Sequence, residues 1–379
     1  MKRLALACML TMLGACRELA PVISEGPALG LPPLPVQAST ATQAQIDLGR
    51  KLFMDRRLSS NNTMSCAMCH VPEQGFAAVE LGTSIGLEGR TLRRNAPTLL
   101  NVAYVGKLFH DGRSPTLEKQ AWTPLLNPIE MGNVETQTLL EKISNMADYN
   151  GKFEAAFGGQ RADREIVATA LASYQRTLVS GNSRFDRWRY GNDQAALNAG
   201  EKAGFAVFSG KGRCIACHTV GEKHALFADG RFHNTGIGWA RSEADPARRY
   251  KVQLAPGVFA DVSAGELTSV SEALQDDTGR FEVTKRPADR WAYRTPGLRN
   301  IALTAPYMHD GSLLTLEAVV DYYQRGGAEH PGKDTLVQPL QLSGMEKRNL
   351  VSFLRTLTGD NTVLLAQQAR AETLNHRHP

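Results

Sequence analysis

The sequence predicts a mainly α-helical protein made of two tandem domains. The pentapeptide CAMCH at 66–70 returns as CIACH at 214–218. Segments with apolar residues at helical spacing lead into both motifs, at 43–55 and 193–209. A longer set of matching residues also recurs at one fixed distance along the chain. A duplicated helical domain accounts for all three observations.

The repeat is clearest downstream of the two motifs. Three pairs of segments match without a gap at an offset of 199 residues: 97–103 with 296–302, 109–112 with 308–311, and 116–118 with 315–317. The motifs themselves are 148 residues apart, so the second copy contains 51 additional residues. This insertion falls within 231–290, which is polar and rich in Asp, Arg and Gly, and we expect loops with short strands there.

The chain begins with the features of an export signal. Lys2 and Arg3 precede an apolar run that is too short to span a membrane as a finished helix. The run ends in Leu-Gly-Ala-Cys at 13–16, which is similar to a bacterial lipobox with Cys16 as the lipidated residue. The alternative is an ordinary cleavage site with a cysteine nearby. The expected location is the periplasm, with the protein anchored to the membrane as a lipoprotein.

The predicted organisation after the signal at 1–16 has three parts. Residues 17–42 are rich in Pro, Ala and Ser and predict a flexible tether. The first domain is expected at 43–190 and includes a long amphipathic run at 164–190. The second is expected at 191–379, where 343–358 has a Ser at the N-cap position and apolar residues at helical spacing.

Composition excludes two classes of protein. With 42% hydrophobic residues, the chain of 379 residues can bury cores and is not expected to be disordered. Its net charge is +5, or +3 once Lys2 and Arg3 leave with the signal. No basic stripe with interleaved aromatic residues is present, so we expect no nucleic-acid partner.

The cysteines indicate a covalently bound cofactor. Cys8 and Cys16 belong to the signal, and the other four occupy the two motifs: Cys66, Cys69, Cys214 and Cys217. Residues three apart lie on one face of a helical turn, so both thiols of a motif can bond one haem, while His70 or His218 binds its iron. A redox pair would not need the histidine, and a four-cysteine zinc site would not need two histidines. We therefore expect two cytochrome c-like domains, each with one c-type haem.

The repeat also predicts that the two haems differ. At the offset of 199, Tyr323 corresponds to Pro124. If this position faces the iron, Tyr323 supplies a sixth ligand to the second haem, whereas proline leaves the first haem open. An open haem binds small oxidants and a closed one transfers electrons. The alternative is that Tyr323 is an aromatic residue of the helical core.

Taken together, the motifs resemble a known family. RRNAPTLLNVAY, FHDGRSPTLEKQ, NPIEMG, TPGLRNIALTAPYMHDG and TLEAVVDYY occur in order within 43–360. They are similar to the bacterial dihaem cytochrome c peroxidase and MauG superfamily, and most like its MauG- and MbnH-type members. The resemblance implies a peroxide-reactive haem in the N-terminal domain and an electron-transfer haem in the C-terminal domain.

The resemblance also implies roles for individual residues. Glu130 would be the acid/base of the peroxide site, with Gln120 and Pro124 beside it; the alternative for Glu130 is a surface carboxylate near a turn. A calcium ion between the domains would be bound by three residues: the Asn95 side chain and the Thr304 and Pro306 carbonyl groups.

Three positions bear on the subfamily. Leu87 stands where many peroxidases of the family place a histidine that caps the peroxide site, which implies an open first haem. Tyr323 stands where the peroxidases place methionine and MauG-like proteins place tyrosine. His110 replaces a tryptophan that usually lies between the haems, and it is either a relay or a structural residue like its repeat mate His309. The tryptophans are alternative relays, or residues of the core and rim: Trp122, Trp188, Trp239 and Trp291.

The resemblance favours one function over two others. A MauG-like enzyme would use hydrogen peroxide to oxidise residues of a partner protein, tryptophan above all, through a high-valent iron intermediate. A peroxidase would reduce hydrogen peroxide with electrons from a small cytochrome c or a cupredoxin. A dihaem electron carrier would have no chemistry of its own, and Glu130, Gln120 and the open first haem argue against it.

Overall fold

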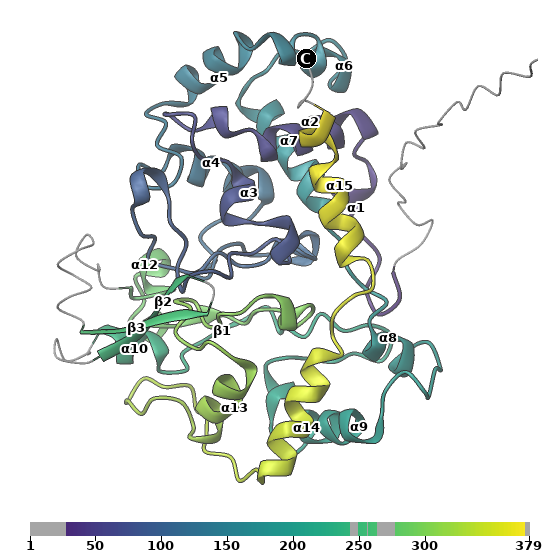
Figure 1. The fold of residues 1–379 in the computed structure, drawn as a ribbon, viewed down its shortest axis with the longest axis vertical. Helices are drawn as coiled ribbons and strands as arrows, with labels where there is room; N and C mark the ends of the chain where they lie inside the picture. Colours follow the sequence, from purple (N-terminus) through teal and green to yellow (C-terminus); the bar gives the residue numbers. More distant parts are fainter. Residues whose placement is uncertain (1–27, 243–248, 256, 264–276, 376–379) are drawn as a thin grey trace, which may run out of the picture.

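The computed structural model describes residues 28–242, 249–255, 257–263 and 277–375. The predicted signal, with Cys8 and Cys16, and residues 17–27 of the expected tether lie outside the described residues. The described chain is mainly helical, as expected, and forms an N-terminal half above a C-terminal half in Figure 1. Each half has its own hydrophobic core. No helix in the described ranges is long and apolar enough to cross a membrane.

The N-terminal half is built around α2 (Gln43–Met54), α4 (Leu117–Leu126) and α7 (Arg164–Arg176). Helix α7 packs against both of the others and buries Val167 and Leu171 almost completely. A Cβ atom at Gly49 of α2 would lie 1.9 Å from the Ala170 carbonyl oxygen of α7, so only glycine permits this approach. Three shorter helices complete this half: α3 (Cys66–Cys69), α5 (Thr136–Ser144) and α6 (Lys152–Ala156).

The C-terminal half repeats this arrangement with α8 (Arg184–Arg189), α9 (Ala199–Ser209), α13 (Leu316–Gln324) and α14 (Gly344–Arg355). Helix α9 packs against α14, and a Cβ atom at Gly204 would lie 2.0 Å from the Asn349 carbonyl oxygen. The predicted cap of α14 is confirmed, because Ser343 and Glu346 form a capping box.

The predicted helix at 164–190 is interrupted. Helix α7 ends at Arg176, and α8 begins only at Arg184. Between them the chain contains Gly181 and Asn182, the latter with a φ of 53° that a helix cannot accommodate, and Ser183 then caps α8. The helix expected at 193–209 likewise begins later, at Ala199.

The predicted repeat is confirmed residue by residue. The 3-10 helices η4 (Val102–Tyr104) and η8 (Ile301–Leu303) correspond at the offset of 199, as do the first residues of α4 and α13. Asn101 and Asn300 adopt the same left-handed conformation, with φ of 63° and 62°. The isolated bridge between Leu108 and Ser114 has its counterpart 199 residues later.

The described part of the insertion contains loops and short strands, as expected, and also short helices, which were not expected. The strand β1 (Phe232–His233) pairs antiparallel with β4 (Tyr293–Arg294), and β2 (Arg249–Ala255) pairs antiparallel with β3 (Val258–Ser263). The hairpin β2–β3 lies at the edge of the molecule beside α10 (Ile237–Ser242) and α12 (Phe281–Thr284) (Figure 1). The remaining 3-10 helices are η1 (Arg56–Leu58), η2 (Pro72–Gln74), η3 (Leu87–Gly89), η5 (Ala147–Tyr149), η6 (Cys214–Ala216) and η7 (Pro287–Asp289).

Both ends of the described chain differ from the expected boundaries. Residues 28–42, assigned to a tether, are packed: Leu31 is buried, the Leu29 carbonyl accepts a hydrogen bond from Asn182, and α1 (Val36–Ser39) contacts α7. Helix α15 (Thr362–Asn375), assigned to the second domain, crosses to the N-terminal half and packs on α2 and η2 (Figure 1). Neither contact leaves a local signal in the sequence.

Candidate active site

The N-terminal half encloses a cavity of about 60 Å³ beside the first CxxCH motif. Its lining includes the N-terminal site residues expected from the sequence except His110 and Asn95: Cys66, Cys69, His70, Gln120, Pro124 and Glu130. Helix α3 carries the cysteines, and α4 carries Gln120 and Pro124, which share a face because they are four residues apart. The turn after α4 brings Glu130 to the same space.

Asn127 holds Glu130 in place. Its Nδ2 donates a 2.7 Å hydrogen bond to Glu130 Oε1, and its carbonyl oxygen accepts from the Glu130 amide at 3.1 Å. Burial raises the pKa of Glu130, although the charge of Arg113 and the Asn127 bond oppose the shift. A carboxyl group with a raised pKa gives up and takes back a proton more readily near neutral pH, as an acid/base requires. Glu130 lines the cavity, so it is not the surface carboxylate that was the alternative interpretation.

The two motif histidines are oriented in the same way. His70 Nδ1 lies 3.2 Å from the Phe76 carbonyl oxygen, and His218 Nδ1 lies 2.8 Å from the Phe227 carbonyl oxygen. A carbonyl group accepts only from a protonated nitrogen, so Nε2 of each ring remains the unprotonated ligand atom. Burial lowers the pKa of both histidines and keeps them neutral.

The partner phenylalanines were not found from the sequence. Phe76 and Phe227 have φ of 55° and 54°, and both side chains are fully buried. A left-handed conformation is costly for a bulky residue, so it persists only where packing and the histidine contact impose it. A φ angle of this kind has no sequence signature when the residue is not glycine or asparagine.

The C-terminal half encloses a larger cavity, of about 290 Å³. Cys214, Cys217 and His218 line it together with Tyr323 of α13. Tyr323 therefore faces the cavity of its half as Pro124 does in the other half, which is the relation that the repeat predicted. Burial raises the pKa of Tyr323. A cation in the cavity would favour the phenolate form.

Both cavities fit a c-type haem. Each offers two thiols that are not in a disulfide and one neutral imidazole with a free Nε2. Cys66 and Cys69, or Cys214 and Cys217, would hold the porphyrin, and His70 or His218 would bind its iron.

His233 is a further residue of the C-terminal cavity that was not anticipated. It lies between two carboxylates, with Nε2 2.8 Å from Asp229 and Nδ1 2.5 Å from Asp334. Hydrogen bonds to Cys217, Asp334 and Asp229 raise the pKa of His233 to about 10, although burial opposes the shift. Cys217, Asp229 and His233 lie close enough to hold a metal ion, but Cys217 belongs to the CxxCH motif. We assign the group to the haem cavity.

His110 lies in the C-terminal cavity, at the junction of the halves, rather than beside Glu130. Its Nε2 donates a 2.9 Å hydrogen bond to the Asn95 carbonyl oxygen, and the Asn95 amide donates to the His309 carbonyl oxygen at 2.7 Å. Burial lowers the pKa of His110 to about 3, so the ring is neutral. The contacts are those of a residue fixed in place at the junction of the halves.

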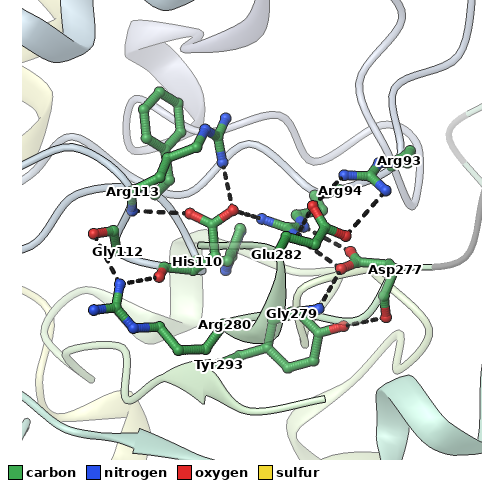
Figure 2. A network of polar contacts seen from close by, with 12 residues as sticks. Arg93, Arg94, His110, Gly112, Arg113, Asp277, Gly279, Arg280, Glu282 and Tyr293 are labelled. Carbon is green, nitrogen blue, oxygen red and sulfur yellow. Dashed lines mark hydrogen bonds and ion pairs between the residues drawn. The ribbon is translucent and has the colours of Figure 1, made fainter. Parts of the chain in front are cut away.

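A network of ion pairs joins the insertion to the N-terminal half (Figure 2). The Arg94 guanidinium binds Asp111 of its own half and both carboxylate oxygens of Asp277 from the insertion. Arg280 of the insertion donates to the Asp111 and Gly112 carbonyl oxygens. Arg94 and Asp277 are mostly buried, so the network fixes the junction beside His110.

The sequence and the fold of this chain match those of known proteins. A family model for di-haem cytochrome c peroxidases matches residues 43–194. The methylamine utilization protein MauG of Methylorubrum extorquens is 35% identical over 333 residues, which cover 88% of this chain and 83% of that protein. The chain belongs to the dihaem cytochrome c peroxidase family. Members of this family are peroxide-dependent dihaem oxidoreductases, and this chain is an enzyme of that class.

Other similar proteins include both peroxidases and a MauG-like protein. Cytochrome-c peroxidase IdrP1 of Denitromonas iodatirespirans is 36% identical over 336 residues, covering 88% of this chain and 86% of that protein. A crystal structure of a MauG-like protein associated with microbial copper homeostasis superposes with a TM-score of 0.70 at 31% identity, covering 88% of this chain and 95% of that one. The diheme peroxidase BthA of Burkholderia thailandensis gives a TM-score of 0.68 at 25% identity, covering 89% and 95%.

Leu87, where the family resemblance implied a capping histidine in other members, lies against the loop that carries Glu130. Its amide donates a 2.9 Å hydrogen bond to the Ile129 carbonyl oxygen, and its side chain is buried. The residues expected to bind calcium, Asn95, Thr304 and Pro306, all line the C-terminal cavity near the junction. Asn95 Nδ2 donates to the Gly82 carbonyl oxygen at 3.1 Å. Calcium binding itself stays a prediction.

Proposed function

We propose that this enzyme is MauG-like: it uses hydrogen peroxide to oxidise residues, above all tryptophan, of a partner protein. The observation that carries the proposal is the place of Tyr323, which lies in the C-terminal cavity with His218 and the two cysteines. When bound there, a haem supplies one-electron chemistry at its iron. A phenolate ligand favours oxidised iron and lowers the reduction potential, whereas the thioether of a methionine raises it. A site with tyrosine therefore suits the storage of an oxidising equivalent.

The residues of the N-terminal cavity have complementary roles in this proposal. Glu130 accepts a proton from bound peroxide and returns it to the leaving oxygen, and Asn127 keeps the carboxyl group aimed at the cavity. Gln120 and Pro124 line this cavity, and the side chains of Pro124 and Leu87 contain no atom that could bind a metal. Peroxide then reaches this site without prior reduction of the enzyme.

The similarity to the MauG-like protein associated with microbial copper homeostasis supports this function. The second candidate is a peroxidase that takes electrons from a small cytochrome c or a cupredoxin, and the comparable identity to a cytochrome-c peroxidase favours it. We also propose a periplasmic location with Cys16 as lipid anchor, based on the N-terminal sequence, and a calcium ion at the junction of the halves.

The proposal is tested on the ferric, haem-loaded enzyme without reductant. We expect one equivalent of peroxide to diminish the intensity of the electron paramagnetic resonance signals of both ferric haems together. We also expect Tyr323→Met to raise the reduction potential of the C-terminal haem in a redox titration. Tyr322→Phe is the matched control, because the neighbouring Tyr322 is bonded to the Thr235 carbonyl group and should leave that potential unchanged. A peroxide reaction that requires prior reduction would identify the conventional peroxidase instead.

A further inference from the structure

Two aromatic clusters of different chemistry flank the C-terminal cavity. The first packs the core and is dominated by phenylalanine: Phe185, Phe205, Phe208, Phe227 and Phe353, with Trp188 and Tyr190 at its edge. The second lies beside α10 and consists of Tyr293, Trp291, His330 and Trp239. Benzene rings resist one-electron oxidation, whereas indole and phenol rings lose an electron much more easily. Oxidisable rings lie at both ends of the second cluster, from Tyr293 and Trp291 to Trp239, so this cluster is the better candidate to carry oxidising equivalents along its length.

The inner end of this second cluster touches the cavity at the junction of the halves. Tyr293 lines the cavity and stacks on His309 with ring centroids 3.7 Å apart and an angle of 13°. Tyr293 and Trp291 both lie against Gly238: a Cβ atom at Gly238 would be 2.8 Å from Tyr293 Oη and 3.2 Å from Trp291 Cδ1. The edges of the two rings therefore border the same space, which a side chain at Gly238 would fill.

The outer end continues through His330 to a partly exposed tryptophan. Trp291 meets His330 edge-on with centroids 5.4 Å apart, and His330 stacks on Trp239 at 5.1 Å with an angle of 11°. His330 accepts a hydrogen bond at Nδ1 from the Gly332 amide and lies 3.2 Å through Nε2 from Asn234 Oδ1. These contacts fix a neutral ring with the proton on Nε2. Trp239 is carried by α10, whose first residue, Ile237, also lines the cavity.

Charges along the cluster indicate where an oxidising equivalent would rest. The Arg290 guanidinium lies 4.6 Å from the centre of the Trp291 ring, and that of Arg94 lies 5.7 Å from Tyr293. A nearby cation makes it harder to remove an electron from a ring. Trp291 Nε1 is buried without a hydrogen-bond partner in the described part of the chain, so no base is placed to take its proton. Trp291 and Tyr293 thus suit passage of charge rather than its storage.

We propose that Tyr293, Trp291, His330 and Trp239 form the route by which electrons from the partner protein reach the C-terminal site, with Trp239 at the outer end. This inference rests on the proposed function and identifies the surface at which the partner protein donates its electrons. Each peroxide takes up two electrons and two protons and becomes two waters. The two electrons pass inward one at a time, and a partner tryptophan or tyrosine that reaches α10 supplies them and releases two protons.

The test uses the haem-loaded enzyme with peroxide and no partner protein. Without a partner, the electrons must come from the residue at the outer end of the route, which is Trp239. Trp239 then loses two electrons to the peroxide and takes an oxygen atom from water, with release of two protons. Peptide mass spectrometry measures oxygenation at each tryptophan. We expect it to concentrate at Trp239 and to fall to background there in Trp291→Phe, which keeps an aromatic ring but not an oxidisable one. Trp188→Phe is the matched control, because Trp188 is also partly buried beside the C-terminal core, and it should leave Trp239 oxygenation unchanged.

Several outcomes would overturn the route. Oxygenation of Trp239 no greater than that of Trp188, or unaffected by Trp291→Phe, excludes it even if both haem signals respond to peroxide. If peroxide leaves both haem signals unchanged, the proposed function fails, and the route fails with it. Trp239→Tyr provides a further check, because a phenol at the outer end should be oxidised in place of the indole.

Discussion

At the scale of single residues, the acid/base assignment depends on the environment of Glu130. Burial holds the pKa of Glu130 above its ordinary value of 4.5, so the carboxylate that accepts a proton is lost when the pH falls through this raised value. We therefore expect the rate of reaction with peroxide to decline on the acid side at a pH above 4.5. Stopped-flow absorbance of the haem-loaded enzyme across a pH series measures this acid limb of the pH–rate profile.

The variant Glu130→Gln removes the titrating group and keeps its size. We expect a reaction slower by roughly 10²- to 10⁴-fold, the usual contribution of a positioned acid/base, with the acid limb gone. Glu135→Gln is the control, because Glu135 is exposed and follows on the same loop. An acid limb that persists in Glu130→Gln would assign it to another group.

Sequence patterns predicted which residues meet in each cavity but not what holds them there. The offset of 199 paired Pro124 with Tyr323, and both line their cavities. The carbonyl groups of Phe76 and Phe227 that orient the histidines depend on a left-handed backbone in residues that rarely adopt it. His233 was missed because its carboxylate partner Asp334 lies 101 residues away.

At the scale of elements, two helices predicted from the spacing of apolar residues are confirmed. The helix at 43–55 and the capped helix after Ser343 are present. The run at 164–190 was misread because its apolar spacing continues through Gly181 and Asn182, where the backbone turns. Turn residues should have outweighed periodicity there.

The contact between α9 and α14 gives a prediction at this scale. Gly204→Ala would place a Cβ atom 2.0 Å from a backbone oxygen of α14, so the helices must separate, and we expect a loss of about 1–3 kcal/mol in the free energy of unfolding. Gly200→Ala in the same helix is the control. Its Cβ would lie 3.3 Å from the end of the Asn349 side chain, so its effect should stay within about 1 kcal/mol. Chemical denaturation compares the two variants, and equal stabilities would argue against close packing at Gly204.

At the scale of the whole molecule, the duplication was visible in the sequence but the joining of the halves was not. The crossing of α15 to the N-terminal half and the packing of residues 28–42 involve contacts between distant segments. Arg370 of α15, for example, binds Glu73 at 2.9 Å, and nothing near either residue in the sequence predicts that pair. Exposed pairs of this kind contribute little energy, so the apolar contacts of α15 with α2 decide its position.

The junction of the halves is instead fixed by buried charge, and this leads to the last prediction. Burial alone would raise the pKa of Asp277, but the hydrogen bonds and charge of Arg94 outweigh it and hold the pKa below the ordinary value of 3.8. A carboxyl group with a lowered pKa contributes stability above its ordinary pKa and loses it as the pH falls toward the lower value. Arg94→Met leaves Asp277 buried without its cation, whereas Asp111 keeps its ion pair with Arg113, so we expect a loss of about 3–5 kcal/mol at neutral pH.

The pH dependence separates this ion pair from a general packing defect. In Arg94→Met, burial without the cation would raise the pKa of Asp277, so its unpaired charge is neutralised by protonation already above pH 3.8, whereas the parent loses the stability from its lowered pKa below 3.8. The difference in free energy of unfolding between Arg94→Met and the parent should therefore shrink as the pH falls from neutral through 3.8. Arg93→Met is the matched control: Arg93 pairs with Glu282, both side chains are partly exposed, and its loss should cost at most about 1 kcal/mol. Denaturation at neutral and acid pH measures each difference. A deficit for Arg94→Met that stays constant with pH would mean that shape, not charge, holds the insertion against the N-terminal half.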